Sequence, residues 1–289
     1  MFSILQLVYS VIIGVVQAVS EWLPISSKTQ ILLASAYLFH MTYSEAYAFG
    51  LFMEIGTTFA AIVYFRKELL SLLRVLALKG SAHEKSLFTY VFIATLMTGI
   101  IGAPLYLAAS SFKNIPLGAP MMIIGLVLIA DAFLIRHSRM KQREGSNIRT
   151  FESLKFKDYL IIGAVQGIAA LPGVSRSGIT TSTLLLMKIE PDEAFRLSFL
   201  IGIFASIAAF GLTLIASHHS VSAALSSMSL TGLVIAIIVS AIMSLFIIDF
   251  LIKIAGRSKI VYLAAALGII AFASGAILMF TPAASLVGA

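Results

Sequence analysis

A polar stretch at residues 171–180, LPGVSRSGIT, interrupts an apolar region and has the residue types of an anion site. Arg176 brings a planar, permanently charged fork of donors that suits a phosphate group. Gly173 and Gly178 let backbone N–H groups approach an anion, and a helix starting near Ser177 would direct its positive end to the same point. Hydroxyl donors complete the set: Ser175, Ser177 and Thr180. The pattern predicts a cradle for phosphate or diphosphate.

An earlier stretch, SEWLPISSKTQ at residues 20–30, adds a carboxylate and two hydroxyls. Glu21 follows Gln17 by four residues, so on a helix both side chains share one face. Glu21 could hold a hard divalent cation, act as a general base, or form a structural ion pair with Lys28 or Arg176. The candidate nucleophiles, which would need activation, are Ser26 and Ser27.

Two further charged residues accompany these stretches. Lys28 could bind phosphate or neutralise Glu21. Glu54 lies in the middle of an apolar segment, LFMEIGTTF, where an ionisable side chain is costly and usually functional. Glu54 either faces the pocket or pairs with a hydroxyl, and the sequence leaves both interpretations open.

The composition indicates whether these residues lie in a soluble protein or in a membrane protein. Of the 289 residues, 60% are hydrophobic and only 11% are charged, whereas soluble domains are about a quarter charged. The mean hydropathy of +1.02 indicates an integral membrane protein. A net charge of +7 would suggest nucleic acid in a soluble protein, but here it indicates basic cytoplasmic loops, so no nucleic-acid partner is expected. Without cysteine, disulfides and thiolate chemistry are excluded.

Hydropathy predicts an all-α polytopic membrane protein with about six full crossings and two re-entrant helical hairpins. The predicted crossings are roughly 46–65, 88–109, 117–136, 194–217, 228–250 and 260–280. The hairpins, about 4–40 and 158–188, contain the two polar stretches. A polar break at membrane depth must be buried in protein or line a wet cavity, so re-entrant hairpins are the economical interpretation.

The distribution of Lys and Arg predicts the orientation. Loops 66–87, 136–157 and 251–259 are basic, whereas loops 110–116 and 218–227 carry one such residue and none. Lys and Arg mark the cytoplasmic side. With six crossings, all basic loops fall inside and the N-terminus falls outside, so the two hairpins enter from opposite sides.

The chain is predicted to be one integral membrane domain, 1–289, built from an inverted repeat. Its halves, about 1–135 and 158–289, are joined by the basic loop 136–157. GVVQAVSEWLPISSKTQ from Gly14 aligns with GAVQGIAALPGVSRSGIT from Gly163 after a one-residue gap. The binding site of an inverted repeat lies near the midplane, where the broken elements meet, so the two polar stretches should converge.

The spacing of further residues supports the repeat. Pro24 precedes Glu45 by 21 residues, and Pro172 precedes Glu193 by 21 residues. In the alternative interpretation, the hairpins only pack through small residues at GxxxG spacing. That alternative leaves Arg176 without a reason to lie at membrane depth.

Both stretches resemble motifs of the undecaprenyl-diphosphate phosphatase family, also called bacitracin resistance proteins. QAVSEWLPISS, at residues 17–27, resembles the family's (E/Q)xxxE motif with its following proline and paired serines. PGVSRSGIT, at residues 172–180, matches PGxSRSxxT at every fixed position. The resemblance covers essentially the whole chain, through its length, both motifs, the repeat and VYFRKEL at residues 63–69.

The resemblance implies a phosphatase that removes the terminal phosphate of a polyprenyl diphosphate and so recycles a carrier lipid for cell-wall or surface glycan synthesis. It implies Mg²⁺ or Ca²⁺ as cofactor, a place in the cell membrane and a pocket that opens toward the outer face. It does not fix an oligomeric state. The implied roles are Glu21 as metal ligand or base with Gln17 assisting, Ser27 or else Ser26 as nucleophile, and Arg176 on the phosphates, supported by Ser175, Ser177 and Thr180.

The chain departs from the family pattern after the paired serines. The usual T-G-H is Lys28-Thr29-Gln30 here, so a histidine given a nucleophilic or acid–base role is replaced by Gln30, which cannot transfer a proton at neutral pH. Gln17 also contributes less charge to a metal than glutamate. Lys28 could replace the histidine, Glu54 could serve as the missing carboxylate and metal ligand, or catalysis is weakened. A second hypothesis is therefore a transporter that moves polyprenyl phosphate or another anionic lipid without hydrolysis.

Overall fold

We describe the protein from a computed structural model. The structure describes residues 4–23, 25–39, 41, 43–110, scattered positions between 122 and 136, 148–171, 174–216, 229–255 and 260–280. The regular structure of these residues is helical apart from one isolated bridge between Arg149 and Ile189. The predicted all-α class is confirmed.

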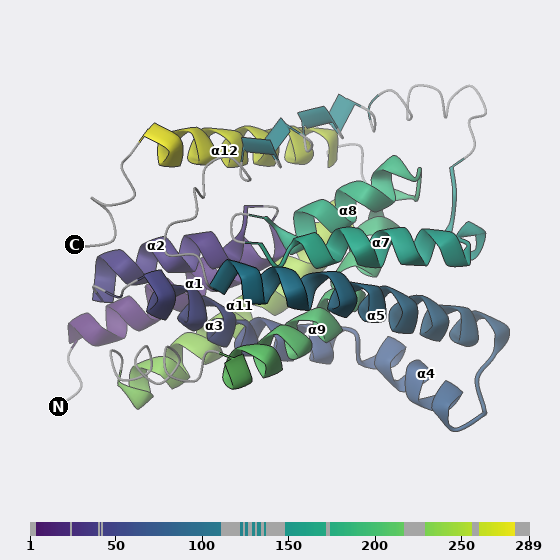
Figure 1. The fold of residues 1–289 in the computed structure, drawn as a ribbon, viewed down its shortest axis with the longest axis horizontal. Helices are drawn as coiled ribbons and strands as arrows, with labels where there is room; N and C mark the ends of the chain where they lie inside the picture. The colour runs from purple at the N-terminus through teal and green to yellow at the C-terminus, as the bar shows by residue number, and fades with distance from the viewer. Residues whose placement is uncertain are drawn as a thin grey trace.

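Long helices run along the long axis of the molecule (Figure 1). In chain order the helices are α1 (Ile4–Trp22), α2 (Ser27–Phe39), α3 (Tyr43–Tyr64), α4 (Arg66–Leu76), α5 (Ala82–Ser110), the 3₁₀ turn η1 (Phe151–Ser153), α7 (Phe156–Ile168), α8 (Arg176–Leu186), α9 (Pro191–Ala216), α11 (Leu230–Ala255) and α12 (Ile260–Phe280).

Several of these helices have the length and hydropathy of membrane spans. Among the described residues, four such helices are Ile4–Trp22, Ala82–Ala108, Pro191–Ile215 and Leu230–Ala255, with shorter apolar helical segments at Phe49–Tyr64 and Ala265–Ile277. These segments overlap five of the six predicted crossings, and the sixth, 117–136, lies mostly outside the described residues. Large apolar side chains such as Phe92 and Phe246 are more than half exposed on the outer surface, as lipid contact requires.

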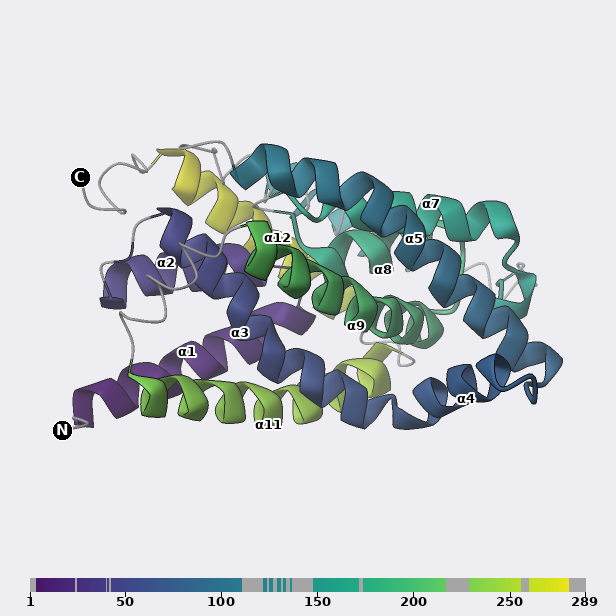
Figure 2. The ribbon, with the colours of Figure 1, turned by 60° about the horizontal axis from the view of Figure 1, so that its bottom comes forward.

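The two predicted hairpins are the helix pairs α1–α2 and α7–α8. With 13 and 11 residues, α7 and α8 are only about 20 and 17 Å long, shorter than a ~30 Å hydrocarbon core. The first arm of the other hairpin, α1, lies within the predicted range 4–40, and its 19 residues have the length of a span. The starts of α1 and α7 lie at opposite ends of the long axis, so the arms run toward each other (Figure 1, Figure 2).

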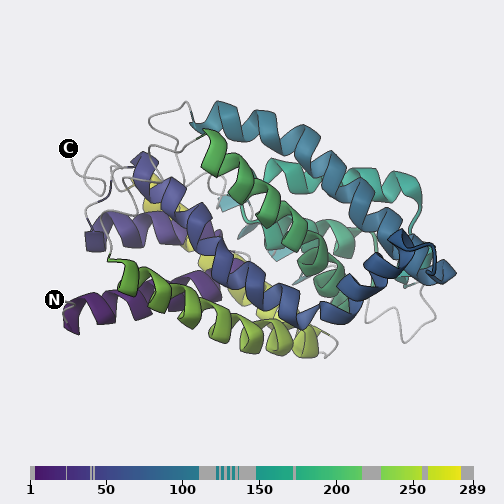
Figure 3. The ribbon, with the colours of Figure 1, turned by 90° about the horizontal axis from the view of Figure 1, so that it is seen from below.

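The positions of the helix ends agree with the orientation that the distribution of Lys and Arg predicts. The segment α4 and the starts of α5 and α7 lie together at one end of the molecule, opposite the start of α1 and the end of α12 (Figure 1, Figure 3). The described parts of the basic loops 66–87 and 136–157 therefore share one side, as the sequence predicts.

Glycines seat the first arm of each hairpin against a long helix. Gly14 packs α1 on α11, where an added Cβ would lie 2.6 Å from the backbone oxygen of Ala236. Gly163 packs α7 on α5, where a Cβ would lie 2.3 Å from the backbone oxygen of Ala94. Because Gly14 and Gly163 open the two aligned segments, matching positions make matching contacts. This supports the inverted repeat, which for the whole chain stays a prediction.

The two inner helices, α3 and α9, contact each other and lie between the α1–α11 pair and the α5–α7 pair (Figure 3). Helices α3 and α9 face the tips of both hairpins. Polar side chains at the centres of these two helices can therefore reach the polar stretches. This position makes α3 and α9 the walls of the site.

Candidate active site

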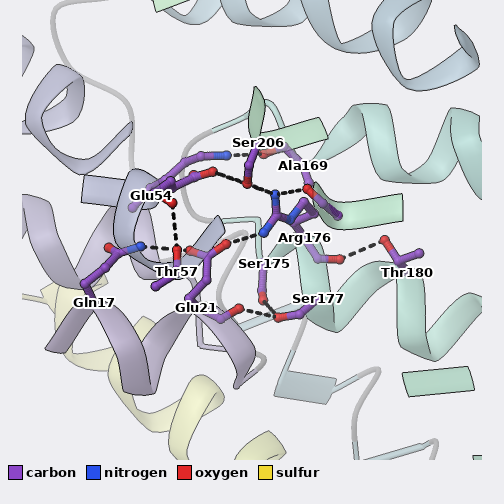
Figure 4. Close-up of polar contacts among 12 residues, drawn as sticks. Gln17, Glu21, Glu54, Thr57, Ala169, Ser175, Arg176, Ser177, Thr180 and Ser206 are labelled. Carbon is purple, nitrogen blue, oxygen red and sulfur yellow. Dashed lines mark hydrogen bonds and ion pairs between the residues drawn. The ribbon is translucent and has the colours of Figure 1, made fainter. Parts of the chain in front are cut away.

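The two polar stretches converge on one buried ion pair. Arg176, the first residue of α8, donates through Nη2 to Oε1 of Glu21, at the end of α1 (Figure 4). Their side chains are 14% and 3% exposed. The predicted convergence is present, and the predicted pairing of Glu21 with a cation selects Arg176 as the partner.

The inner helices complete the surroundings of Arg176. Its Nη1 donates to the carbonyl oxygen of Gly202 at 2.7 Å and to the hydroxyl of Ser206, both on α9. The Ser206 hydroxyl donates to Oε2 of Glu54 at 2.6 Å, and that carboxylate oxygen lies 3.7 Å from Nη1 (Figure 4). Glu54 therefore faces the pocket and also pairs with a hydroxyl, so both open interpretations hold. One guanidinium lies between two carboxylates.

The start of α8 has the geometry of an N-terminal cap. Ser175 is the N-cap, and its hydroxyl accepts from the backbone N–H of Gly178 at 3.2 Å. The helix begins at Arg176, one residue before the predicted position. Because Ser175 has β-region backbone angles and a side-chain oxygen, it satisfies one of the free N–H groups of the first turn. The guanidinium thus lies at the positive end of α8.

The other two hydroxyls of this stretch fix the position of α8. Ser177 donates to the backbone oxygen of Glu21 at 3.0 Å, which ties α8 to the end of α1. Thr180 donates to the backbone oxygen of Arg176 at 2.8 Å and lies 3.5 Å from Oε1 of Gln166. These hydroxyls position Arg176 rather than point into open space. Gly173 lies outside the described residues.

The first stretch places one serine at the carboxylate. Gln17 donates through Nε2 to Oε2 of Glu21 at 3.1 Å, which confirms that the two share a helix face. The Ser27 hydroxyl lies beside the Glu21 carboxylate. Ser26 instead has a left-handed backbone, with φ of 58°, and its hydroxyl bonds that of Thr29 at 3.0 Å. Of the two candidate nucleophiles, Ser27 has the neighbouring carboxylate.

The residues that replace the family's T-G-H lie near the same turn. Lys28 donates through Nζ to the carbonyl oxygen of Ala169, at the end of α7, at 3.1 Å. Gln30 donates through Nε2 to the carbonyl oxygen of Ile25 at 3.1 Å. Gln30 thus stabilises the local turn, while Lys28 crosses to the other hairpin.

A cavity of about 220 Å³ lies beside Arg176 and is bounded by α3, α5, α7 and α9. Its charged lining is Lys28, Glu54 and Arg176. Most of the remaining wall consists of small or apolar residues, including Gly102, Ala103, Ala170, Ala205 and Ala209. A lining of three charged residues and many small apolar ones suits a lipid with an anionic headgroup.

Sequence reasoning missed three polar residues that support this site. Ser206 bridges Arg176 and Glu54, and Gln166 donates through Nε2 to the hydroxyl of Thr98 at 3.1 Å. The repeat held a signal for one of them, because Gln166 aligns with Gln17. Ser206 and Thr98 carried no signal, since single hydroxyls are common in apolar helices.

Residues 10–273 match the protein family described as Bacitracin resistance protein BacA. The chain belongs to this family. It is 47% identical over 268 residues to a protein named Undecaprenyl-diphosphatase from Saccharolobus solfataricus, across 92% of this chain and 94% of that protein. A protein of the same name from Sulfurisphaera tokodaii is 43% identical over 263 residues, across 90% and 94%. One from Pyrobaculum islandicum is 37% identical over 243 residues, across 83% and 87%.

This BacA family member has oxygen ligands suited to a divalent cation that is shared with a substrate. Within the described residues, no group of three or more His, Cys, Asp or Glu side chains forms a self-contained metal site. The carboxylates of Glu21 and Glu54 flank Arg176, and Oε1 of Gln17 is buried with no hydrogen-bond partner. Mg²⁺ is usually bound by one or two carboxylates with phosphate oxygens and water completing its shell. The donor set fits such a cation.

Proposed function

We propose that this protein is a polyprenyl-diphosphate phosphatase of the undecaprenyl type, a hydrolase that regenerates the polyprenyl phosphate carrier lipid. The observation that carries the proposal is the buried Arg176 between Glu21 and Glu54, with the Ser27 hydroxyl beside the Glu21 carboxylate. Membership of the BacA family and the shared name of the relatives support the same activity.

Arg176 binds the terminal phosphate of the substrate through its planar fork. As phosphate oxygens take over the guanidinium, the Glu21 carboxylate loses part of its ion pair and becomes free to accept a proton. Glu21 therefore pairs with Arg176 when no substrate is bound and acts as general base when the substrate is bound.

Ser27 then attacks the terminal phosphorus and passes its proton to Glu21. A bond forms between Oγ and phosphorus, the bond from phosphorus to the bridging oxygen breaks, and polyprenyl phosphate leaves with the electron pair. Glu21 passes this proton to the leaving polyprenyl phosphate and becomes a carboxylate again. Water next attacks the phosphoserine and gives a proton to Glu21, and the bond from phosphorus to Oγ breaks. Glu21 returns that proton to Oγ, which restores Ser27 as inorganic phosphate is released. Because phosphoryl transfer is mostly positioning and charge neutralisation, Arg176 and a divalent cation held by carboxylates would be the expected parts beside the serine.

Mg²⁺ or Ca²⁺ would be held by Glu21, Glu54 and the amide oxygen of Gln17, and would neutralise charge on the phosphates. Glu54 in this scheme supplies the second carboxylate that Gln17 cannot. Ser206 keeps Glu54 turned toward Arg176 through its 2.6 Å hydrogen bond.

The test is phosphate release from farnesyl diphosphate and from a long polyprenyl diphosphate by purified protein in detergent, with Mg²⁺, with Ca²⁺ and with chelator. We expect metal-dependent release that is lost in Arg176→Met. Arg66→Met is the matched control, because Arg66 is exposed at the start of α4 and lies outside the cavity lining. Full release by Arg176→Met would overturn the assignment of the site.

A second candidate function is the transport of polyprenyl phosphate without hydrolysis. It is favoured by the opposed hairpins and by Gln30, which bonds the Ile25 carbonyl oxygen instead of providing a proton. Vesicles that carry a fluorescent polyprenyl phosphate separate the two functions. Movement of the lipid between leaflets with no phosphate release from the diphosphate would select transport.

The multi-pass protein is proposed to lie in the cell membrane with its pocket open to the outer face, on the basis of loop charge. The absence of native cysteine allows single-cysteine labelling. Lys79→Cys, in the turn after α4, should react with an impermeant maleimide only from the cytoplasmic side. Thr231→Cys, in the first turn of α11, should react only from outside. The opposite result would reverse the orientation.

A further inference from the structure

Lys28 is the counterpart of Arg176 in the repeat. Pro24 and Pro172 align at a separation of 148 positions, and Lys28 and Arg176 are separated by the same 148 positions. Each cation belongs to the first turn of the second arm of its hairpin, since α2 begins at Ser27 and α8 at Arg176. Each also lies at the positive end of its own helix, where an anion is favoured and a bare cation is not.

The two cations make reciprocal contacts across the halves. Arg176, in the second half, reaches Glu21 near the end of α1. Lys28, in the first half, reaches the carbonyl oxygen of Ala169 at the end of α7. Each cation therefore rests on the C-terminal end of the first arm of the other hairpin, where helix carbonyl groups carry partial negative charge.

The surroundings of the two cations differ, although both line the same cavity. Arg176 lies among Glu21, Glu54 and Ser206, and Glu21 is the carboxylate that interacts with Ser27. Lys28 has a neutral carbonyl acceptor on Ala169, which belongs with Ala170 to the apolar wall of the cavity. A neutral carbonyl is a weaker partner for an ammonium than a phosphate is, and the flexible stem of lysine lets the amine change partners.

We propose that Lys28 and Arg176 form a two-cation clamp for the diphosphate, one cation from each half of the chain. Arg176 holds the terminal phosphate at the reacting serine, and Lys28 holds the phosphate attached to the lipid. This assignment rests on the proposed hydrolysis. When the bridging bond breaks, the new negative charge appears on the lipid-linked phosphate, so Lys28 neutralises the leaving group. The same contact retains the polyprenyl phosphate product.

The clamp is tested by binding without turnover, using farnesyl monophosphate and inorganic phosphate as separate probes. The proteins are wild type, Lys28→Met, Lys28→Arg, Arg176→Met and the charge-matched control Lys85→Met, which removes an exposed lysine at the start of α5. Thermal unfolding of each protein in detergent shows that it is folded before the dissociation constants are compared.

Lys28→Met should weaken farnesyl monophosphate binding by about tenfold or more, the loss of one charge-assisted hydrogen bond, while inorganic phosphate binding changes by less than about twofold. Arg176→Met should weaken the binding of inorganic phosphate more than Lys28→Met does. Lys28→Arg should keep most of the affinity for farnesyl monophosphate, and Lys85→Met should match wild type for both probes.

Unchanged farnesyl monophosphate binding in Lys28→Met would overturn the clamp, and so would an equal loss of both probes in that variant. Failure of the proposed function is a different result. If wild type released no phosphate from farnesyl diphosphate, hydrolysis would be refuted, while the dissociation constants would still decide whether each cation has its own phosphate.

Discussion

Arg176 and Glu21, which are 155 residues apart in the chain, form a buried ion pair that joins the two hairpins. The pair is not isolated, because Glu54 lies 3.7 Å from the other terminal nitrogen of the guanidinium. Removing one partner of a buried pair leaves the other charge without compensation, which is more costly than replacing both. The three charges therefore predict an ordered series of stabilities.

Arg176→Met should destabilise the protein more than Glu21→Gln does. The first change leaves two carboxylates facing each other, whereas the second leaves Arg176 with Glu54. A loss of roughly 3–5 kcal/mol is typical when one partner of a buried pair is removed. The double variant Glu21→Gln/Arg176→Met should be more stable than Arg176→Met alone and should stay inactive. Thermal unfolding in detergent measures the order, and losses that add in the double variant would contradict coupling between the two residues.

The paired serines should differ sharply in their effect on hydrolysis. Ser27→Ala removes the hydroxyl beside Glu21 and should abolish phosphate release while lipid binding persists. Ser26→Gly should retain most of the activity, because glycine adopts the positive φ of 58° without strain and only the bond to Thr29 is lost. Initial rates with farnesyl diphosphate measure both effects. If Ser26→Gly were inactive and Ser27→Ala active, the nucleophile would be Ser26.

The sequence predicted the polar contacts that depend on local spacing. Gln17 and Glu21 share a helix face because they are four residues apart, and their 3.1 Å hydrogen bond follows from that spacing. The meeting of Glu21 and Arg176 was also predictable, since an inverted repeat brings its two broken elements together. The sequence allowed the prediction that Gly14 and Gly163 pack closely against other helices. It did not show which helices these would be.

The contributions of α9 could not be predicted. Ser206 is a hydroxyl in an apolar helix, and its position between Arg176 and Glu54 depends on how α9 packs against α3. The partner of Lys28 on α7 is a backbone carbonyl, which no side-chain pattern marks.

Glu54→Gln should raise the Mg²⁺ concentration needed for half-maximal activity. The amide retains the shape and the Ser206 hydrogen bond but removes the charge that would attract a cation. We expect a shift of about tenfold, the usual lower range for the loss of a group that supports a metal site. Gln17→Glu should shift the requirement in the opposite direction, because it adds a carboxylate beside Glu21.

Glu68→Gln is the control for Glu54→Gln, because Glu68 lies on α4 and pairs with Arg196 away from the cavity. Titrations of phosphate release against Mg²⁺ in a metal buffer give the Mg²⁺ concentration for half-maximal activity of each of the three variants. A Glu54→Gln variant with an unchanged requirement for Mg²⁺ would show that Glu54 serves Arg176 alone.

The glycines that seat the hairpins should tolerate no side chain. A Cβ at Gly163 would lie 2.3 Å from the backbone oxygen of Ala94, and one at Gly14 would lie 2.6 Å from that of Ala236. Since a backbone oxygen cannot move without shifting its helix, Gly163→Leu and Gly14→Leu should push α7 from α5 and α1 from α11. Each change should lower the unfolding temperature and reduce phosphate release, because it displaces the hairpin that carries Arg176 or Glu21.

Gly211→Ala is the matched control, because a Cβ at this helical position would meet nothing within 4 Å. It should keep full activity and unfold at the same or a slightly higher temperature, since alanine favours the helix by up to about 1 kcal/mol. Circular dichroism melts and initial rates compare the three variants. Wild-type activity in Gly163→Leu would mean that the seating of α7 on α5 does not position Arg176.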